Sequence, residues 1–167
     1  KNQNRGFGEK DLGQYNLVED FDYMDDICVF VSTEMINKIG AYDEDFFFYY
    51  EETEWNYRIK KNGWRIVYNP GMKVWHRAHG STGGDIYNPL IEHHRARGEF
   101  LFNFKTNSST LYLLFFTLNF FSFSLLYRLF LLIKKSKIEV FRSTFTGSFS
   151  GLLWLIQRVK ATLYANN

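Results

Sequence analysis

Cysteine is almost absent from this sequence, and acids are almost absent from its last third. A single cysteine, Cys28, stands among 167 residues, which excludes an internal disulfide and fits a reducing compartment without requiring one. Residues 106–167 hold one acid against seven lysines and arginines, whereas residues 1–105 hold 17 acids against 13 bases. The net charge of +2 therefore combines an acidic front part with a basic tail. This division predicts a catalytic portion joined to a membrane-seeking one.

No signal-peptide pattern opens the chain, whose first residue is Lys1, so we expect a fragment of a longer protein. A length of 167 residues suffices for one domain with a core, or for part of a larger one. Aromatic residues, in contrast, are abundant and make up 20% of the chain. Five of them are consecutive at residues 46–50. Because five adjacent side chains cannot all be buried on one face, we expect some to line a pocket or an interface.

The front of the chain shows short elements separated by turns. Residues 1–16 have no periodicity and are expected to form a loop. The stretch Phe21–Ser32 alternates like one strand of a covered sheet. A short helix should follow, capped by Ser32 or Thr33 and stopped by Gly40.

A second helix, strand and turn are expected further along. Apolar residues at helical spacing predict a helix that begins near Glu51 and ends at Gly63. Residues 64–68 alternate like a strand, Asn69-Pro70-Gly71 is a turn sequence, and residues 73–76 are again strand-like. The order of these elements predicts a mixed α/β fold.

Three carboxylates cluster at the start of the second helix. Glu51 and Glu52 fall in its first turn, where the helix dipole favours the ionised form. Acids are common in first turns, and Glu54 with Arg58 is an ordinary pair four residues apart. Three acids that follow an aromatic run and precede a histidine-containing strand nevertheless favour a functional site.

Other polar residues leave two interpretations open. His76 and His79 have the spacing of metal ligands on a turn, although two histidines alone are weak support for a metal. Residues 79–84 are rich in glycine and could approach a phosphate or be an ordinary flexible loop. Asp25 and Asp26 could solvate a strand edge or hold a sugar hydroxyl.

Taken together, these motifs resemble a known enzyme family. The matching positions are Arg5-Gly6, Gly13-Gln14-Tyr15, Asp22-Tyr23, Ile39-Gly40-Ala41-Tyr42-Asp43-Glu44, Tyr50-Glu51-Glu52-Thr53-Glu54-Trp55, Arg58, Gly63-Trp64, Asn69-Pro70, Val74-Trp75-His76 and Gly80-Ser81. In this order they resemble the C-terminal part of family 2 glycosyltransferases with the GT-A fold, of the rhamnosyltransferase and galactofuranosyltransferase type. The family usually carries Glu-Asp or Asp-Asp where this chain has Glu51-Glu52, and tends to have glycine near Asp26.

The resemblance implies roles for individual residues. Glu52 would be the general base that takes the proton of the acceptor hydroxyl, and Glu51 would hold acceptor hydroxyls. His76 would help to hold a divalent metal, Mg²⁺ or Mn²⁺, on the sugar diphosphate. Further substrate-binding residues implied in the same way are Glu54, Trp55, His79, Ser81 and Arg97.

The resemblance also implies partners and a missing part. The donor would be a nucleotide sugar and the acceptor a glycan or a lipid-linked sugar in cell-surface polysaccharide synthesis, with no nucleic-acid partner. Residues 1–105 would be the acceptor-side part of the GT-A domain, because the family's nucleotide-binding half and its Asp-X-Asp metal motif lie upstream of the matching region. Asp20-Phe21-Asp22 only imitates that motif at the wrong place. We therefore expect the metal to be shared with the donor-binding half.

The tail, residues 106–167, is expected to associate with a membrane. Residues 111–133 are rich in Leu and Phe and long enough to cross a bilayer, but polar residues interrupt them. Residues 138–163 form an amphipathic pattern with Phe145, Phe149 and Ile156 on one stripe. We expect a helical hairpin at the cytoplasmic face of an anionic membrane, peripheral or monotopic, with a true transmembrane span as the alternative. Residues 93–97, which include Arg97, could meet an acceptor diphosphate or form a solvated basic turn.

Two other functions compete with this interpretation. A membrane-anchored module without catalysis, derived from such an enzyme or acting as a partner subunit, would explain the lack of a nucleotide-binding half. A histidine–carboxylate metal hydrolase would need more ligands than the sequence supplies.

Overall fold

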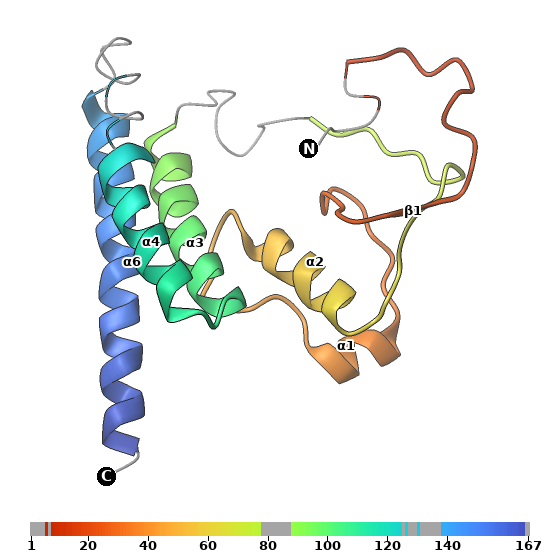
Figure 1. The fold of residues 1–167 in the computed structure, drawn as a ribbon. Coiled ribbons are helices and arrows are strands. Elements are labelled where there is room, and N and C mark those ends of the chain that lie inside the picture. The colour runs from red at the N-terminus through yellow and green to blue at the C-terminus, as the bar shows by residue number, and fades with distance from the viewer. Residues whose placement is uncertain are drawn as a thin grey trace. The chain divides into compact units, whose positions relative to one another are not determined.

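The structure is a computed structural model that describes residues 6, 8–77, 88–124, 126, 130 and 138–165. The chain forms a mixed α/β fold in which helices predominate (Figure 1). It divides into two compact units, one made of residues 1–41 and 55–77 and the other of residues 42–54 and 78–167. The boundary passes through helix α2, Glu51–Lys61, so the acids of its first turn belong to the second unit.

The first unit is built around a small antiparallel sheet. Strand β1, Glu19–Phe21, pairs with strand β2, Ile66–Tyr68, so that Asp20 lies opposite Val67. Helix α1, Thr33–Ile39, and the later turns of α2 supply the core. Its buried apolar side chains are Met35, Trp55, Ile59 and Ile66.

Helix α2 also fixes the end of α1. The last carbonyls of a helix have no partner inside it and need donors from elsewhere. Arg58 supplies two of these donors, to the carbonyls of Ile39 and Ala41, and the indole N–H of Trp55 donates to the Gly40 carbonyl at 3.0 Å. Gly40 adopts a φ of 80°, which a glycine tolerates and most other residues do not. Hydrogen bonds from Trp55 and Arg58 therefore join α2 to the three consecutive carbonyls of residues 39–41.

The second unit is a group of helices. Helix α3, Pro89–Thr106, begins at the N-cap Asn88 and packs along helix α6, Ile138–Ala165. Helix α4, Thr110–Asn119, continues into a π-helical turn, η2, Phe120–Ser124. The ring of Phe100 in α3 lies near the rings of Phe116 and Phe120, so α3 contacts α4 and η2 through aromatic side chains.

Several predicted elements are confirmed. Ser32 caps α1 through its side chain, and Gly40 ends that helix. Helix α2 begins at Glu51, and the turn after β2 forms at Asn69, whose carbonyl accepts from the Met72 amide at 3.2 Å. The amphipathic pattern of residues 138–163 corresponds to helix α6, Ile138–Ala165.

Two predicted strands are wrong. Of the strand predicted at Phe21–Ser32, only Phe21 lies in a strand, as the last residue of β1, and residues 73–76 have no regular secondary structure, although both segments alternate apolar and polar residues. An alternating segment becomes a strand only when a neighbouring strand accepts its hydrogen bonds. In the described part of the chain the sheet has two strands, β1 and β2. Ile27, Phe30 and Val74 are accordingly exposed.

The tail can be compared with the expectations for a membrane segment. Among the described residues, no helix combines the length and the apolar character that crossing a membrane requires. The predicted division at residue 105 into an enzyme part and a tail stays a prediction.

Candidate functional site

The acidic start of α2 lies directly after a pair of strained tyrosines. Tyr49 and Tyr50 have φ values of 64° and 74°, a conformation that side chains other than glycine rarely adopt. The Glu54 amide donates to the Tyr50 carbonyl at 2.9 Å, which opens the hydrogen-bond ladder of the helix. Glu51 and Glu52 therefore lie at the N-terminus of α2, where the helix dipole favours a negative charge.

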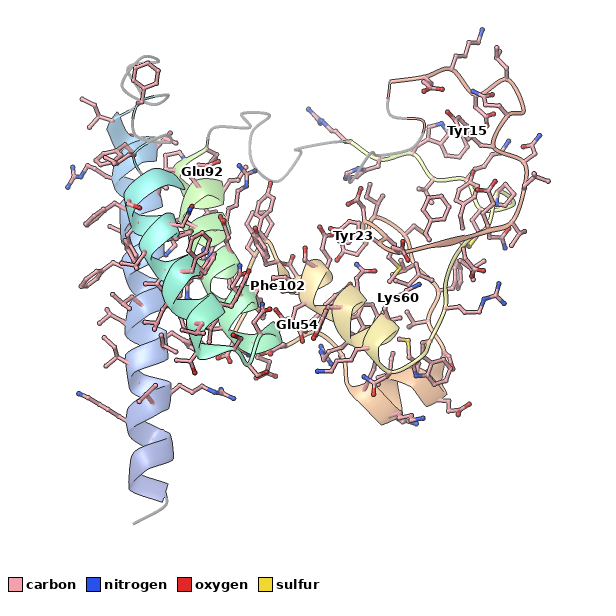
Figure 2. The ribbon with its side chains drawn as sticks, in the orientation of Figure 1. Tyr15, Tyr23, Glu54, Lys60, Glu92 and Phe102 are labelled. Carbon is pink, nitrogen blue, oxygen red and sulfur yellow. The ribbon has the colours of Figure 1, made fainter. Side chains whose placement is uncertain are left out.

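Helix α3 holds the two tyrosines in place. Gly98 is buried, and a Cβ atom at this position would lie 2.9 Å from both the Tyr49 carbonyl oxygen and the Tyr50 Cβ atom. The ring of Tyr50 contacts the ring of Phe102, with centroids 5.9 Å apart, and the Arg95 guanidinium lies 5.1 Å from the ring centre of Tyr49. Figure 2 shows Phe102 on this helix. The backbone that leads into Glu51 is thus fixed by close packing against a glycine.

An ionic cluster anchors the segment that precedes these tyrosines. The Lys105 ammonium donates to the carboxylates of Asp43 and Asp45. Burial by itself would raise the pKa of Asp45, but hydrogen bonds from Lys105 and Trp154 and the charges of Lys105 and Arg158 outweigh it and lower this pKa. The sequence interpretation missed this cluster because its members are about 60 residues apart, and nothing near Lys105 identifies the pair as partners.

The basic residues of α3 also contact the aromatic run. The ring of Phe47 lies 5.0 Å from that of His94, centroid to centroid, and Nδ1 of His93 lies 3.0 Å from the Thr146 hydroxyl of α6. Burial lowers the pKa of both histidines, and the neighbouring charge of Arg97 lowers it further. Phe46 is buried and Phe47 is exposed, so the five aromatic side chains do not share one buried face; that some of them line a pocket or an interface stays a prediction.

Arg97 has a defined partner within the second unit. Its Nη1 donates to the main-chain carbonyl of Asp45. This bond ties α3 to the segment before the tyrosines, as Lys105 does. The guanidinium thus positions the acidic segment, and its predicted contact with substrate stays a prediction.

The remaining predicted substrate-binding residues fall into two groups. Glu54 and Trp55 are 5% and 4% exposed, so both side chains lie inside their units. Figure 2 shows Glu54 on the first part of α2. One oxygen of Glu51, Oε2, is also shielded from solvent, whereas Glu52 is half-buried. His79 and Ser81 lie outside the described residues.

Asp20 and Asp22, which imitate a metal-binding Asp-X-Asp motif, form ion pairs with basic side chains of the first unit. Arg65 donates to Asp20 through two parallel bonds of 2.8 and 2.9 Å, which span β1 and the residue before β2. Lys60 lies 3.1 Å from Asp22 (Lys60 is labelled in Figure 2). The hydrogen bond from Arg65 lowers the pKa of Asp20. Both acids are therefore paired with basic side chains of the first unit.

A divalent metal would need more ligands than the described residues gather in one place. His76 is exposed and belongs to the first unit. Within the described ranges, no three histidine, cysteine, aspartate or glutamate side chains form a group that could hold a metal ion. One imidazole does not make a metal centre. Within the part of the chain that the structure describes, His76 therefore does not belong to a complete metal site.

The first unit also contains an apolar cavity of about 460 Å³. Its lining includes Phe30, Met35 and Trp64, together with the carboxylate-bearing Asp25. Of the predicted site residues that the structure describes, which are His76, Glu51, Glu52, Glu54, Trp55 and Arg97, none lines it.

Comparisons with known proteins give a partial relationship. The chain is 35% identical over 74 residues to N-acetylglucosaminyl-diphospho-decaprenol L-rhamnosyltransferase of Mycobacterium tuberculosis, in each of two strains. The match covers 44% of this chain and 24% of the relative, so the chain spans about a quarter of the length of the curated relatives it matches. No protein-family model matches the chain, and no solved structure does. The partial match supports a glycosyltransferase-like relationship.

Proposed function

We propose that this chain is the acceptor-side part of a glycosyltransferase, and that Glu52 is its general base. The supporting observation is the start of α2. There, Glu51 and Glu52 occupy the first turn, directly after two tyrosines that α3 holds in a strained conformation. The partial identity to a rhamnosyltransferase supports the reaction class.

The proposed reaction needs one base and no second acid from this chain. Glu52 takes the proton of an acceptor hydroxyl while that oxygen forms a bond to the anomeric carbon of the donor sugar. The bond from the anomeric carbon to the diphosphate oxygen breaks on the opposite face, and its electron pair leaves with the nucleotide diphosphate. The configuration at the anomeric carbon is therefore inverted.

The neighbouring residues position this base. The N-terminus of α2 favours a negative charge at this position, which suits a carboxylate that acts as a base. Glu51 holds further acceptor hydroxyls, and Arg97 and Lys105 fix the backbone in front of both acids through Asp45. A base misplaced by about 1 Å can lose about a hundred-fold in rate, so this anchoring has catalytic value.

The proposed acceptor is a sugar linked through a diphosphate to a polyprenol, as in the name of the relative. The donor is a nucleotide sugar, bound mainly by a part of the enzyme outside this chain. His76 would add one ligand to a divalent metal held there. The alternative is a module without catalysis, and it predicts that Glu52 is dispensable.

The test is the transfer of a labelled sugar to such an acceptor by membranes from cells that express the natural gene. Glu52→Gln keeps the shape and removes the proton acceptor, so we expect the transfer rate to fall about a hundred- to ten-thousand-fold. Glu34→Gln is the matched control, because Glu34 is an exposed glutamate in the first turn of α1. A Glu52→Gln enzyme within a few-fold of the wild type would refute the assignment and favour the non-catalytic module.

A further inference from the structure

The face of α6 that packs against α3 consists of small and hydroxyl-bearing residues. A Cβ atom at Gly147 would lie 2.0 Å from the His93 carbonyl oxygen, and one at Gly151 would lie 2.9 Å from the Phe100 Cβ atom. The two helix backbones therefore approach each other closely. The buried members of this face are Val140, Thr144, Gly147, Ser148 and Gly151.

The hydroxyls on this face are satisfied inside their own helix. Thr144 donates to the Val140 carbonyl at 2.9 Å, and Ser148 donates to the Thr144 carbonyl at 2.9 Å. In α4, Thr117 donates in the same way to the Leu113 carbonyl at 2.7 Å. Polar groups satisfied in this manner need no water, which is how hydroxyl side chains are accommodated in helices surrounded by lipid.

The opposite faces of α4 and α6 carry the large apolar side chains. In α4, Leu111, Leu114, Phe115 and Leu118 recur at the spacing of one helix face, and Leu111 and Leu118 are 80% and 71% exposed. In α6 the exposed apolar residues are Ile138, Phe145, Phe149, Leu153, Ile156 and Val159.

This arrangement is the reverse of the pattern expected in water. A water-exposed helix turns its large apolar residues toward the core and its polar residues outward. Helices in lipid associate through small residues and turn Leu, Ile and Phe toward the acyl chains. Contiguous exposed apolar faces of this kind mark a surface that something else covers.

Basic residues lie on the same side of α6 as its apolar face. Arg142 and Lys160 are 18 residues apart, which is about five turns of an α-helix, so they project in the same direction. Phe149 is seven residues, or about two turns, beyond Arg142 and lies near the same line. Both basic side chains are exposed. Long basic side chains at such positions place their apolar stems on lipid and their charges among headgroups.

We infer that the outer faces of α4 and α6 bind the surface of an anionic phospholipid leaflet. The large apolar side chains enter the boundary between headgroups and acyl chains, and Arg142 and Lys160 contact the anionic headgroups. Residues 106–167 contain seven basic residues and one acid, so their positive charge is complementary to an anionic surface. This inference is independent of the proposed catalytic role of Glu52.

Flotation of the full chain on lipid vesicles tests the inference, because aggregated protein sinks and bound protein rises. We expect the chain to float with vesicles of equal parts phosphatidylcholine and phosphatidylglycerol. Replacement of both basic residues, Arg142→Gln with Lys160→Gln, should weaken binding about five-fold for each charge removed. Vesicles of phosphatidylcholine alone should bind the wild-type chain more weakly.

The apolar faces are tested by replacing exposed side chains, which leaves the core intact. Leu114→Ser with Leu118→Ser should lower binding about ten-fold or more, because each leucine loses part of its burial in lipid. Ile27→Ser with Phe30→Ser is the matched control, since these two side chains are exposed in the first unit and should not affect flotation. The inference would be overturned if both double variants lost vesicle binding equally. It would also be overturned if the wild-type chain stayed at the bottom of the gradient as a defined oligomer.

A second measurement covers the possibility that the serine variants unfold. An environment-sensitive fluorophore attached at Leu118→Cys, in a Cys28→Ser background, should shift to the blue when anionic vesicles are added. Cys28 must be removed because it is exposed and would also be labelled. An unchanged emission spectrum would show that the α4 face stays in water, against the inference.

Discussion

Gly147 gives the sharpest test of the contact between α3 and α6. An alanine in the middle of a helix ordinarily stabilises a protein by about 0.5–1 kcal/mol relative to glycine. At Gly147, however, the new Cβ atom would lie 2.0 Å from the His93 carbonyl oxygen, whereas real Cβ atoms essentially never approach closer than 3.0 Å. The helices would have to separate by at least about 1.0 Å, from 3.0 − 2.0 Å.

The magnitude follows from the cost of overpacking. Forcing an extra carbon into a packed contact costs about 1–3 kcal/mol, and more when the obstacle is backbone rather than a flexible side chain. The clash should therefore outweigh the helix-propensity gain, and Gly147→Ala should lower the free energy of unfolding. Helix propensity alone would raise the free energy of unfolding, and the packing clash would lower it. The sign of the measured change therefore shows which effect is larger.

Urea unfolding followed by far-ultraviolet circular dichroism measures this free energy. Gln157→Ala is the control, because Gln157 is exposed on the same helix and should change stability by less than about 0.5 kcal/mol. Gly151→Ala should also destabilise, since its Cβ atom would meet Phe100 at 2.9 Å. A Gly147→Ala protein as stable as the wild type, or more stable, would refute the close helix contact described above.

Two further predictions concern histidines. Burial lowers the pKa values of His93 and His94, so the folded state favours their neutral forms. The protein therefore has its full stability above the unfolded pKa near 6.5. Its stability declines as the pH falls from there through the lowered pKa values of the folded state. Urea midpoints should decline over that range in the wild type and less in a His93→Asn, His94→Asn variant, and a wild-type midpoint that rises on acidification would contradict this sign. His76 should bind Mn²⁺ only weakly in this chain, because it offers one exposed imidazole. Calorimetric titration that shows tight stoichiometric binding, abolished by His76→Ala, would disprove the proposal that the other ligands lie outside the chain.

Local signals explain the parts of the fold that the sequence predicted. The side chain of Ser32 caps the start of α1, and the backbone of Gly40 ends it. The turn at Asn69 depends on a hydrogen bond to its carbonyl from an amide three residues away. The strand predicted at Phe21–Ser32 has the right alternation, but alternation does not supply a pairing partner, and only Phe21 of this segment lies in a strand. Strands depend on distant segments, so short windows of sequence predict them less well than caps and turns.

The same distinction applies to the candidate site. The placement of Glu51 and Glu52 in a first turn was predictable from the residues around them. The anchoring of that turn was not, because Lys105 lies 60 residues beyond Asp45. The periodicity of α6 predicted an apolar stripe, yet it could not indicate that the small-residue face, with Gly147 at its centre, is the buried one.

Under the proposed role of Glu52, the tyrosine pair before α2 limits how far the protein can be stabilised without loss of function. Residues held with positive φ cost about 1–3 kcal/mol each, and glycine at Tyr49 or Tyr50 would relieve that cost. Glycine would also remove either the Tyr50 ring, which contacts Phe102, or the Tyr49 ring, which lies beneath Arg95. The segment that aims Glu51 and Glu52 would then be looser. At these two positions, a substitution that raises the stability of the chain would therefore also loosen the orientation of Glu51 and Glu52.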